Sequence, residues 1–152
     1  MTSPMPAPET VGTDSPHRVE LALEADAQML FLARMTGAAV AARADFDFEQ
    51  VEDLRLAVDE LCIRLMSTGG GTGRITLLFQ WNDEGILDVT GTLVPDGSPS
   101  TDGHDRRLSP AAPSVELSER ILDALVDDHG GDTIGGVHKG WLRMRRRERS
   151  AS

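Results

Sequence analysis

The stretch LAVDELCIRLM, residues 56–66, carries the side chains of this chain that could do chemistry. Asp53, Ala57, Glu60 and Arg64 share one stripe of a predicted helix, because they recur at intervals of three or four residues. A carboxylate at such a boundary position can be a general base for water or a serine hydroxyl when phosphate and magnesium are held beside it. The alternative is a marginal ion pair between Glu60 and Arg64 at i, i+4, and the residues alone favour this ion pair.

Three other segments have the composition of a functional site. The glycines at 69–73 follow a predicted helix and lack the lysine of a phosphate-binding loop, so a flexible connector is the better interpretation. Asp127, Asp128, His129 and Asp132 stand at the predicted end of a helix, where a solvated turn is favoured over a metal site. The arginines at 143–149 are interpreted as an outward strand face and a frayed end rather than a nucleic-acid patch, and docking to an acidic protein stays open.

Composition limits the possible functions. The 152 residues, 39% of them hydrophobic, are enough for one soluble domain with its own core. A net charge of -10 argues against binding to nucleic acid and favours a basic partner protein. The single cysteine, Cys62, cannot form an internal disulfide or a cysteine metal cluster. The sequence has neither a membrane-length apolar run nor a secretion signal at its start, so we expect a cytoplasmic protein.

The elements around Glu60 follow from apolar periodicity and capping residues. Residues 18–25 alternate as a half-buried strand, and residues 25–44 have helical spacing. A second helix is predicted to begin at about Phe48, with Asp47 as its N-cap and Gln50 completing a capping box. Its predicted core stripe and hydrophobic staple comprise Phe46, Val51, Leu54, Val58, Leu61, Cys62 and Leu65.

The second half of the chain adds strands and one more helix. RITLLFQW and GILDVTGTLV, separated by turn residues, predict a hairpin. A third helix is predicted from the cap Ser114 to Gly130, with Leu117, Ile121, Leu122 and Leu125 on its inner face, and residues 132–148 predict two short strands. This order predicts an α+β fold, a two-layer sandwich whose mostly antiparallel sheet is covered by helices on one face.

The predicted domain covers residues 17–147. Residues 1–16 are rich in Pro, Ser and Thr and predict a disordered arm, and residues 148–152 a frayed end. The segment 94–113 is long for a connection inside a compact domain, so we interpret it as a lid-like loop or a disordered insertion.

The layout from Arg18 to Arg147 resembles the anti-sigma-factor serine kinases of the RsbW type, a branch of the histidine kinase-like ATPases. The resemblance rests on FEQVEDLRLAVDELC, on RILDALVDD and on the closing strand GWLRMR. It implies a histidine kinase-like ATPase fold and makes Glu60 the general base. In the family, an asparagine four residues later binds magnesium between the ATP phosphates, and that position is Arg64 here.

The chain departs from this family's pattern at its nucleotide-binding positions. Arginine has no acceptor atom and cannot bind magnesium, although a guanidinium can bind phosphate directly. Asp96 and Gly97 are a shifted fragment of the Asp-x-Gly-x-Gly signature that holds adenine. PSVELSER replaces the glycine-rich turn before the last helix, and Gly140 and Trp141 replace a Gly-Thr pair. Arg64, Asp96 and Gly97 are therefore interpreted as candidate nucleotide contacts, functional or vestigial, with no metal ligand predicted.

The resemblance and its departures predict a regulatory protein that binds a partner and has weak or no ATP binding. The partner would be a sigma factor, an anti-anti-sigma-type protein, or a second copy of this chain or of an active relative. No cofactor is then expected. If the nucleotide site is functional, the protein would require ATP and Mg²⁺. The alternatives are an active ATP-dependent serine/threonine kinase, and a structural domain that shares only the fold.

Overall fold

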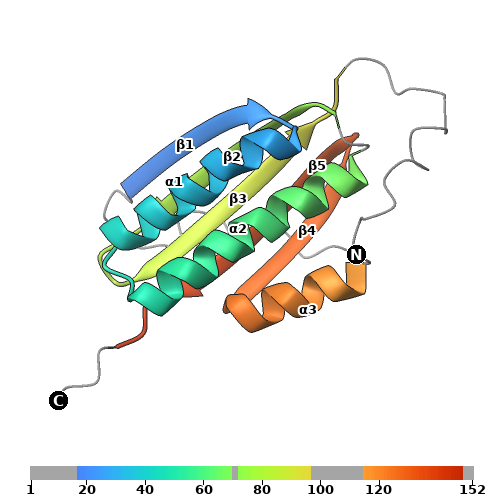
Figure 1. Cartoon of the computed structure of the whole chain (residues 1–152). Coiled ribbons are helices and arrows are strands. Elements are labelled where there is room, and N and C mark those ends of the chain that lie inside the picture. Colours follow the sequence, from blue (N-terminus) through green and yellow to red (C-terminus); the bar gives the residue numbers. More distant parts are fainter. Residues whose placement is uncertain (1–16, 70–71, 97–114, 149–152) are drawn as a thin grey trace.

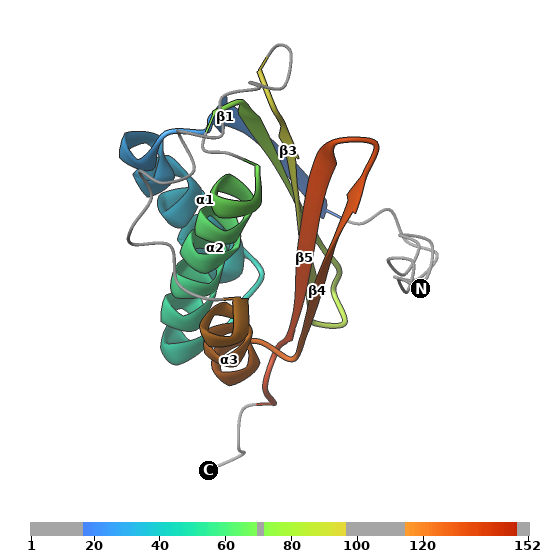
Figure 2. The same ribbon diagram turned by 90° about the vertical axis from the view of Figure 1, so that its right-hand side faces the viewer.

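The computed structural model describes residues 17–69, 72–96 and 115–148, which form a two-layer α+β sandwich. One layer is a five-stranded antiparallel sheet, and the other consists of helices. Figure 2 shows that the helices all lie on the same face of the sheet. The predicted fold class is therefore confirmed.

Several predictions concern residues outside the described part of the chain. They are the arm at 1–16, Gly97, most of the lid-like loop at 94–113, Ser114 as a helix cap, and all but the first residue of the frayed end at 148–152. These remain predictions.

The elements have the following bounds. In chain order they are β1 (His17–Glu24), the 3-10 helix η2 (Ala27–Met29), α1 (Leu30–Arg43), α2 (Phe48–Thr68), β2 (Arg74–Trp81), β3 (Ile86–Val94), α3 (Val115–Leu125), β4 (Asp128–Ile134) and β5 (Val137–Arg145). The sheet order is β1-β2-β3-β5-β4, so β1 and β4 are its edges (Figure 1).

The start of α2 matches its local sequence signal. The Asp47 side chain accepts a hydrogen bond from the Gln50 backbone N–H at 2.8 Å, as an N-cap should, and α2 begins at Phe48 as predicted. The predicted core stripe is also confirmed at Leu54, Val58, Leu61, Cys62 and Leu65, which are all buried, while Val51 is only partly buried against the core. The phase of this stripe fixes which side of α2 meets the sheet.

Glycines let α2 approach the sheet closely. Gly91 of β3, Gly140 of β5 and Gly131 of β4 are register partners in neighbouring strands. A Cβ atom at Gly91 would lie 2.8 Å from Leu65 Cδ1, and one at Gly140 would lie 2.5 Å from Leu61 Cδ1. Both separations are shorter than carbon–carbon contact distances. Leu65 and Leu61 of α2 therefore occupy the space that side chains at Gly91 and Gly140 would fill.

The thiol of Cys62 should be unreactive in the native protein. Burial in the core raises its pKa to about 12, with a smaller contribution from Asp59. Because the thiolate is the reactive form, we expect iodoacetamide at pH 8 to leave the native chain unmodified and to add one group per chain in urea, read by intact mass. Native modification at the rate of a free cysteine peptide would contradict this buried position.

Two predicted boundaries are wrong. The helix predicted for 25–44 is divided, because Asp26 caps the short η2 through the Gln28 backbone N–H before α1 begins. The third helix ends at Leu125 and not at Gly130. The backbone N–H of Asp127 donates instead to the Arg143 carbonyl oxygen at 3.0 Å, and the chain then continues as β4.

The end of β5 is tied to the start of α2. The side chain of Gln50, which is buried, donates to the Arg145 carbonyl at 2.8 Å and accepts from the Arg147 N–H at 3.2 Å. Arg146 donates to the Ala44 carbonyl at 2.9 Å. Arg143 forms a two-pronged contact with Asp88 at 2.6 and 2.9 Å. The side chains of Arg143 and Arg146 therefore have partners within the domain.

Candidate functional site

Glu60 lies on α2 with its carboxylate buried. The residue is only 8% exposed, and its Oε2 accepts a hydrogen bond from Ser118 Oγ of α3 at 3.0 Å. Ser118 is itself 2% exposed. The carboxylate is thus enclosed between two helices and does not belong to a solvated helix face.

Arg64 also contacts α3. Its Nη2 lies 3.6 Å from Glu119 Oε1, and within the described part of the chain it forms no ion pair with Glu60. The alternative of an i, i+4 ion pair between Glu60 and Arg64 is therefore wrong. The pair with Glu119 is partly exposed, and such pairs contribute at most about 1 kcal/mol.

The orientation of α3 explains these contacts. Ser118 and Leu122 stand at i, i+4 on one face of α3, and both are buried. Leu117, which was predicted on the inner face, is 49% exposed. The buried face includes Ser118, whose hydroxyl has the Glu60 carboxylate as its polar partner. Sequence reasoning missed Ser118, although its position four residues before Leu122 was an available signal.

A small hollow adjoins Arg64 between the helices and the β4–β5 hairpin. Its volume is about 150 Å³. Arg64 brings positive charge to it, Lys139 of β5 also lines it, and Glu60 is not in its lining. The other lining residues are Leu61, Leu65, Thr68, Leu122, Gly130, Gly131, Asp132, Thr133, His138 and Gly140.

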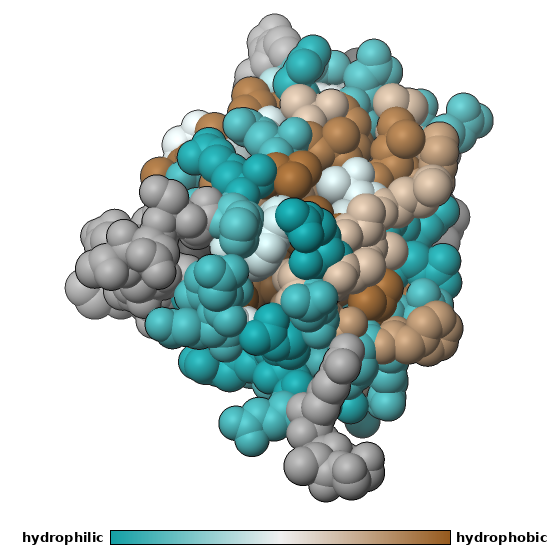
Figure 3. All heavy atoms as spheres, turned by 90° about the vertical axis from the view of Figure 1, so that its left-hand side faces the viewer, coloured by the Kyte–Doolittle hydropathy of each residue, from teal (hydrophilic) through white to brown (hydrophobic). Residues whose placement is uncertain are grey.

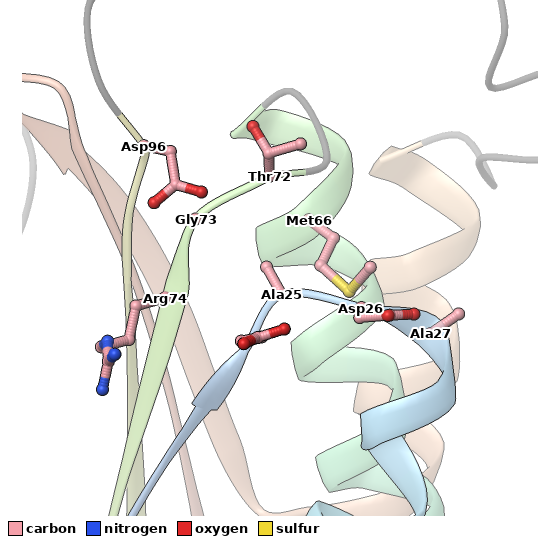
Figure 4. Close-up of a pocket in the computed structure, with 9 residues that line it drawn as sticks. Ala25, Asp26, Ala27, Met66, Thr72, Gly73, Arg74 and Asp96 are labelled. Atoms are coloured by element: carbon pink, nitrogen blue, oxygen red, sulfur yellow. The ribbon is translucent and has the colours of Figure 1, made fainter.

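Asp96 belongs to a different hollow. This hollow has a volume of about 510 Å³, and Asp96 and Arg74 lie on one side of it while Met66 and Asp26 lie on the other (Figure 4). Neither Glu60 nor Arg64 lines it. The structure brings Glu60 and Arg64 together against α3 but does not join Asp96 to them.

Two bacterial relatives cover most of this chain. The anti-sigma-F factor RsbW of Mycobacterium tuberculosis is 33% identical over 135 residues, which are 84% of this chain and 73% of the relative. The serine-protein kinase RsbW of Bacillus cereus is 30% identical over 123 residues, 73% of this chain and 74% of the relative. The chain belongs to the RsbW family. No family model matches it.

Family membership confirms the resemblance, and it allows a test of whether magnesium-ATP fits this RsbW-family chain. Arg64 offers no oxygen ligand for a metal ion. The carboxylate of Glu60 is already bonded to Ser118. The hollow beside Arg64, about 150 Å³, is smaller than the roughly 300 Å³ or more that ligand pockets provide. Among the described residues, position 64 therefore supplies no metal ligand, and the carboxylate of Glu60 has its partner on α3.

Asp53, the first residue of the predicted stripe, lies close to Arg147 of the C-terminal segment. Arg147 Nη2 lies 3.8 Å from its Oδ2. Burial, followed by the charge of Glu49, nevertheless raises the pKa of the Asp53 carboxyl above its ordinary value. The distant guanidinium only partly offsets these two effects. Asp53 therefore packs near the C-terminal segment.

The acidic segment near the third helix is part of the sheet. Asp128, His129 and Asp132 lie in β4, so the prediction of a solvated turn at a helix end is wrong. Gly130 is paired with Trp141 there, and a Cβ atom at Gly130 would lie 2.7 Å from the indole Nε1. No group of three or more acidic, histidine or cysteine side chains that could hold a metal occurs within 17–69, 72–96 and 115–148. None of the helices in these ranges is long and apolar enough to cross a membrane.

Proposed function

We propose that this chain is an anti-sigma-type regulator that acts by binding a partner protein, with ATP binding weakened or lost. The partner is a sigma factor or an anti-anti-sigma-type protein, in keeping with the name of the Mycobacterium tuberculosis relative. The mechanism is sequestration in the cytoplasm, in which a folded surface of this chain competes for the partner.

One observation supports the proposed loss of phosphoryl transfer. The carboxylate that the resemblance makes the general base is buried and accepts the Ser118 hydroxyl of α3. A general base must reach the proton it removes, within about 3 Å or through one water. Glu60 is instead used to hold α3, and the neighbouring Arg64 contacts the same helix.

We expect calorimetry to give no saturable heat with millimolar ATP, with or without magnesium. The reason is that Arg64, four residues after Glu60, cannot bind magnesium, and that the hollow beside Arg64 is small. Purified sigma factors from the same cell should bind in the same buffer without nucleotide, with a measurable Kd by biolayer interferometry. Saturable magnesium-dependent heat would contradict the loss of ATP binding, and failure to bind any of these factors or an anti-anti-sigma-type protein would overturn partner sequestration.

An active serine/threonine kinase is the second candidate. Two observations favour it: Glu60 is retained, and the Bacillus cereus relative is named a serine-protein kinase. Transfer of labelled phosphate to an anti-anti-sigma-type protein, lost in Glu60→Gln but kept in the matched control Glu119→Gln, would establish this candidate. Glu119 is a suitable control because its side chain is half exposed on α3.

A further inference from the structure

The helix α3 is attached to the rest of the domain by few apolar contacts. Within residues 116–125, only Ser118 and Leu122 are buried, and Leu117 is 49% exposed. By contrast, α2 buries residues throughout its core stripe. An element with few buried apolar contacts can open locally, at a lower free energy than the unfolding of the whole domain. The packing of α3 is that of such an element.

Two ion pairs at the surface complete the attachment of α3. Glu119 Oε1 lies 3.6 Å from Arg64 Nη2 of α2. Asp123 Oδ1 lies 2.6 Å from His129 Nε2 of β4. The side chains of Glu119 and Asp123 are 51% and 71% exposed, so water competes for both pairs. Exposed pairs of this kind contribute little to stability, and these two therefore hold α3 only weakly.

The chain that follows α3 is anchored and can serve as a pivot. The Asp127 backbone N–H donates to the Arg143 carbonyl oxygen at 3.0 Å, and Asp127 Oδ2 accepts from the Arg145 N–H at 2.7 Å. These bonds tie the chain to β5 two residues after α3 ends at Leu125. Release of α3 from α2 therefore requires no hydrogen bond of the sheet to break.

In this position, α3 covers the Glu60 carboxylate. A hydroxyl that donates to a carboxylate at about 3 Å has the geometry that a general base needs with the hydroxyl of its substrate. Here the Ser118 hydroxyl has that position, 3.0 Å from Glu60 Oε2. Leu122 is the α3 residue in the lining of the hollow beside Arg64, so release of α3 would also remove this wall of the hollow.

We infer that α3 is a releasable cap that blocks Glu60, with the Ser118 hydroxyl in the position of a substrate hydroxyl. The cap is closed in the structure, and its release exposes Glu60 and widens the hollow beside Arg64 while the core stays folded. This inference concerns access to Glu60, and it holds whether the chain sequesters a partner or transfers phosphate. Its test therefore uses neither ATP nor a partner protein.

The test compares the reaction rates of two buried groups of α2 in the full chain. Glu60 is modified with a water-soluble carbodiimide and excess glycinamide at a single-hit dose, and Cys62 is modified with iodoacetamide. Both rates are read by peptide mass mapping, and each is divided by the rate of the same group in urea. Cys62 is buried in the core, so its reaction reports opening of the core and serves as the reference for Glu60.

Leu122→Ala removes the buried apolar side chain of α3, and Leu23→Ala is its matched control. The two leucines are 1% and 4% exposed. Leu23 belongs to β1, at the opposite edge of the sheet from β4 and on the left-hand side of Figure 1. Figure 3, which views that side, shows apolar residues gathered there. The control therefore weakens the core away from α3. Ser118→Ala is a second α3 variant, in case Leu122→Ala does not fold.

We expect Glu60 of the unmodified chain to react over a time in which Cys62 does not, and each α3 variant to raise the Glu60 rate at least tenfold. Leu23→Ala should raise the Cys62 rate at least tenfold and leave the Glu60 rate within twofold, because α3 opens without the core.

Three results would overturn the cap. A parallel rise of both rates in Leu23→Ala would mean that only unfolding of the core exposes Glu60. An unchanged Glu60 rate in the folded α3 variants would mean that α3 does not control access to Glu60. A Glu60 rate in the unmodified chain equal to its rate in urea would mean that α3 is not closed.

Discussion

Replacing Gly140 by valine is expected to lower the free energy of unfolding by about 3 kcal/mol, at the upper end of the usual cost of overpacking. The first atom of the new side chain would lie 2.5 Å from Leu61 Cδ1, so the Leu61 side chain must change its rotamer or α2 must shift. Leu61 is 2% exposed and is enclosed by the rest of the core, which limits its freedom to adjust. Valine favours strands, but this preference is worth at most about 1 kcal/mol.

Urea denaturation of Gly140→Val should be compared with Lys139→Val. Lys139 precedes Gly140 on β5 and is exposed on the opposite face of the sheet. Both substitutions create a valine on the same strand, and the control should stay within about 0.5 kcal/mol of the unmodified chain. Equal midpoints for the two variants would mean that α2 does not lie against the glycines of the sheet.

The elements predicted correctly are those whose signals are local. The start of α2 depends on Asp47 and Gln50, which are three residues apart. The turn between β2 and β3 depends on Asn82, whose side chain accepts from the Glu84 and Ile86 backbone N–H groups, and on Gly85, whose φ is 89°. Such signals act within one turn of chain, so they can be interpreted without knowledge of the fold.

The end of α3 could not be predicted in this way. Asp127 leaves the helix because its backbone N–H and side chain bind the backbone of Arg143 and Arg145, more than fifteen residues away. Gly130 serves as a strand residue beneath the indole of Trp141, whereas a glycine after an apolar helix usually indicates a helix end. Tertiary pairing decided both positions.

In the candidate site, too, local spacing predicts some features, and tertiary contacts determine the others. The position of Glu60 beside a core stripe was evident from helical spacing, but its donor is 58 residues away on α3. Helical spacing predicts a pair between Arg64 and Glu60, which are four residues apart, but α3 supplies a different partner for each. A buried carboxylate has to be satisfied by some donor, and only the packing of α3 identifies which one.

Replacing Ser118 by alanine is expected to lower the free energy of unfolding by about 2 kcal/mol, within the range for a lost hydrogen bond to a charged group. The reason is that Glu60, 8% exposed, would keep its carboxylate in the same place without the 3.0 Å donor. The measurement is urea denaturation at neutral pH. Ser67→Ala is the control, because Ser67 is exposed on α2 and its loss should change stability by less than about 0.5 kcal/mol.

A double-mutant cycle with Glu60→Gln separates the charge of Glu60 from simple packing. The glutamine keeps the shape of the side chain, and its amide oxygen can still accept from Ser118. The loss of Ser118 should therefore cost about 1 kcal/mol less in this background, since a neutral acceptor is cheaper to leave unpaired. An equal cost in both backgrounds would mean that Ser118 only fills space between α2 and α3. A smaller cost in the Glu60→Gln background would mean that α3 is held in place by the charge of the carboxylate that the RsbW resemblance assigns to catalysis.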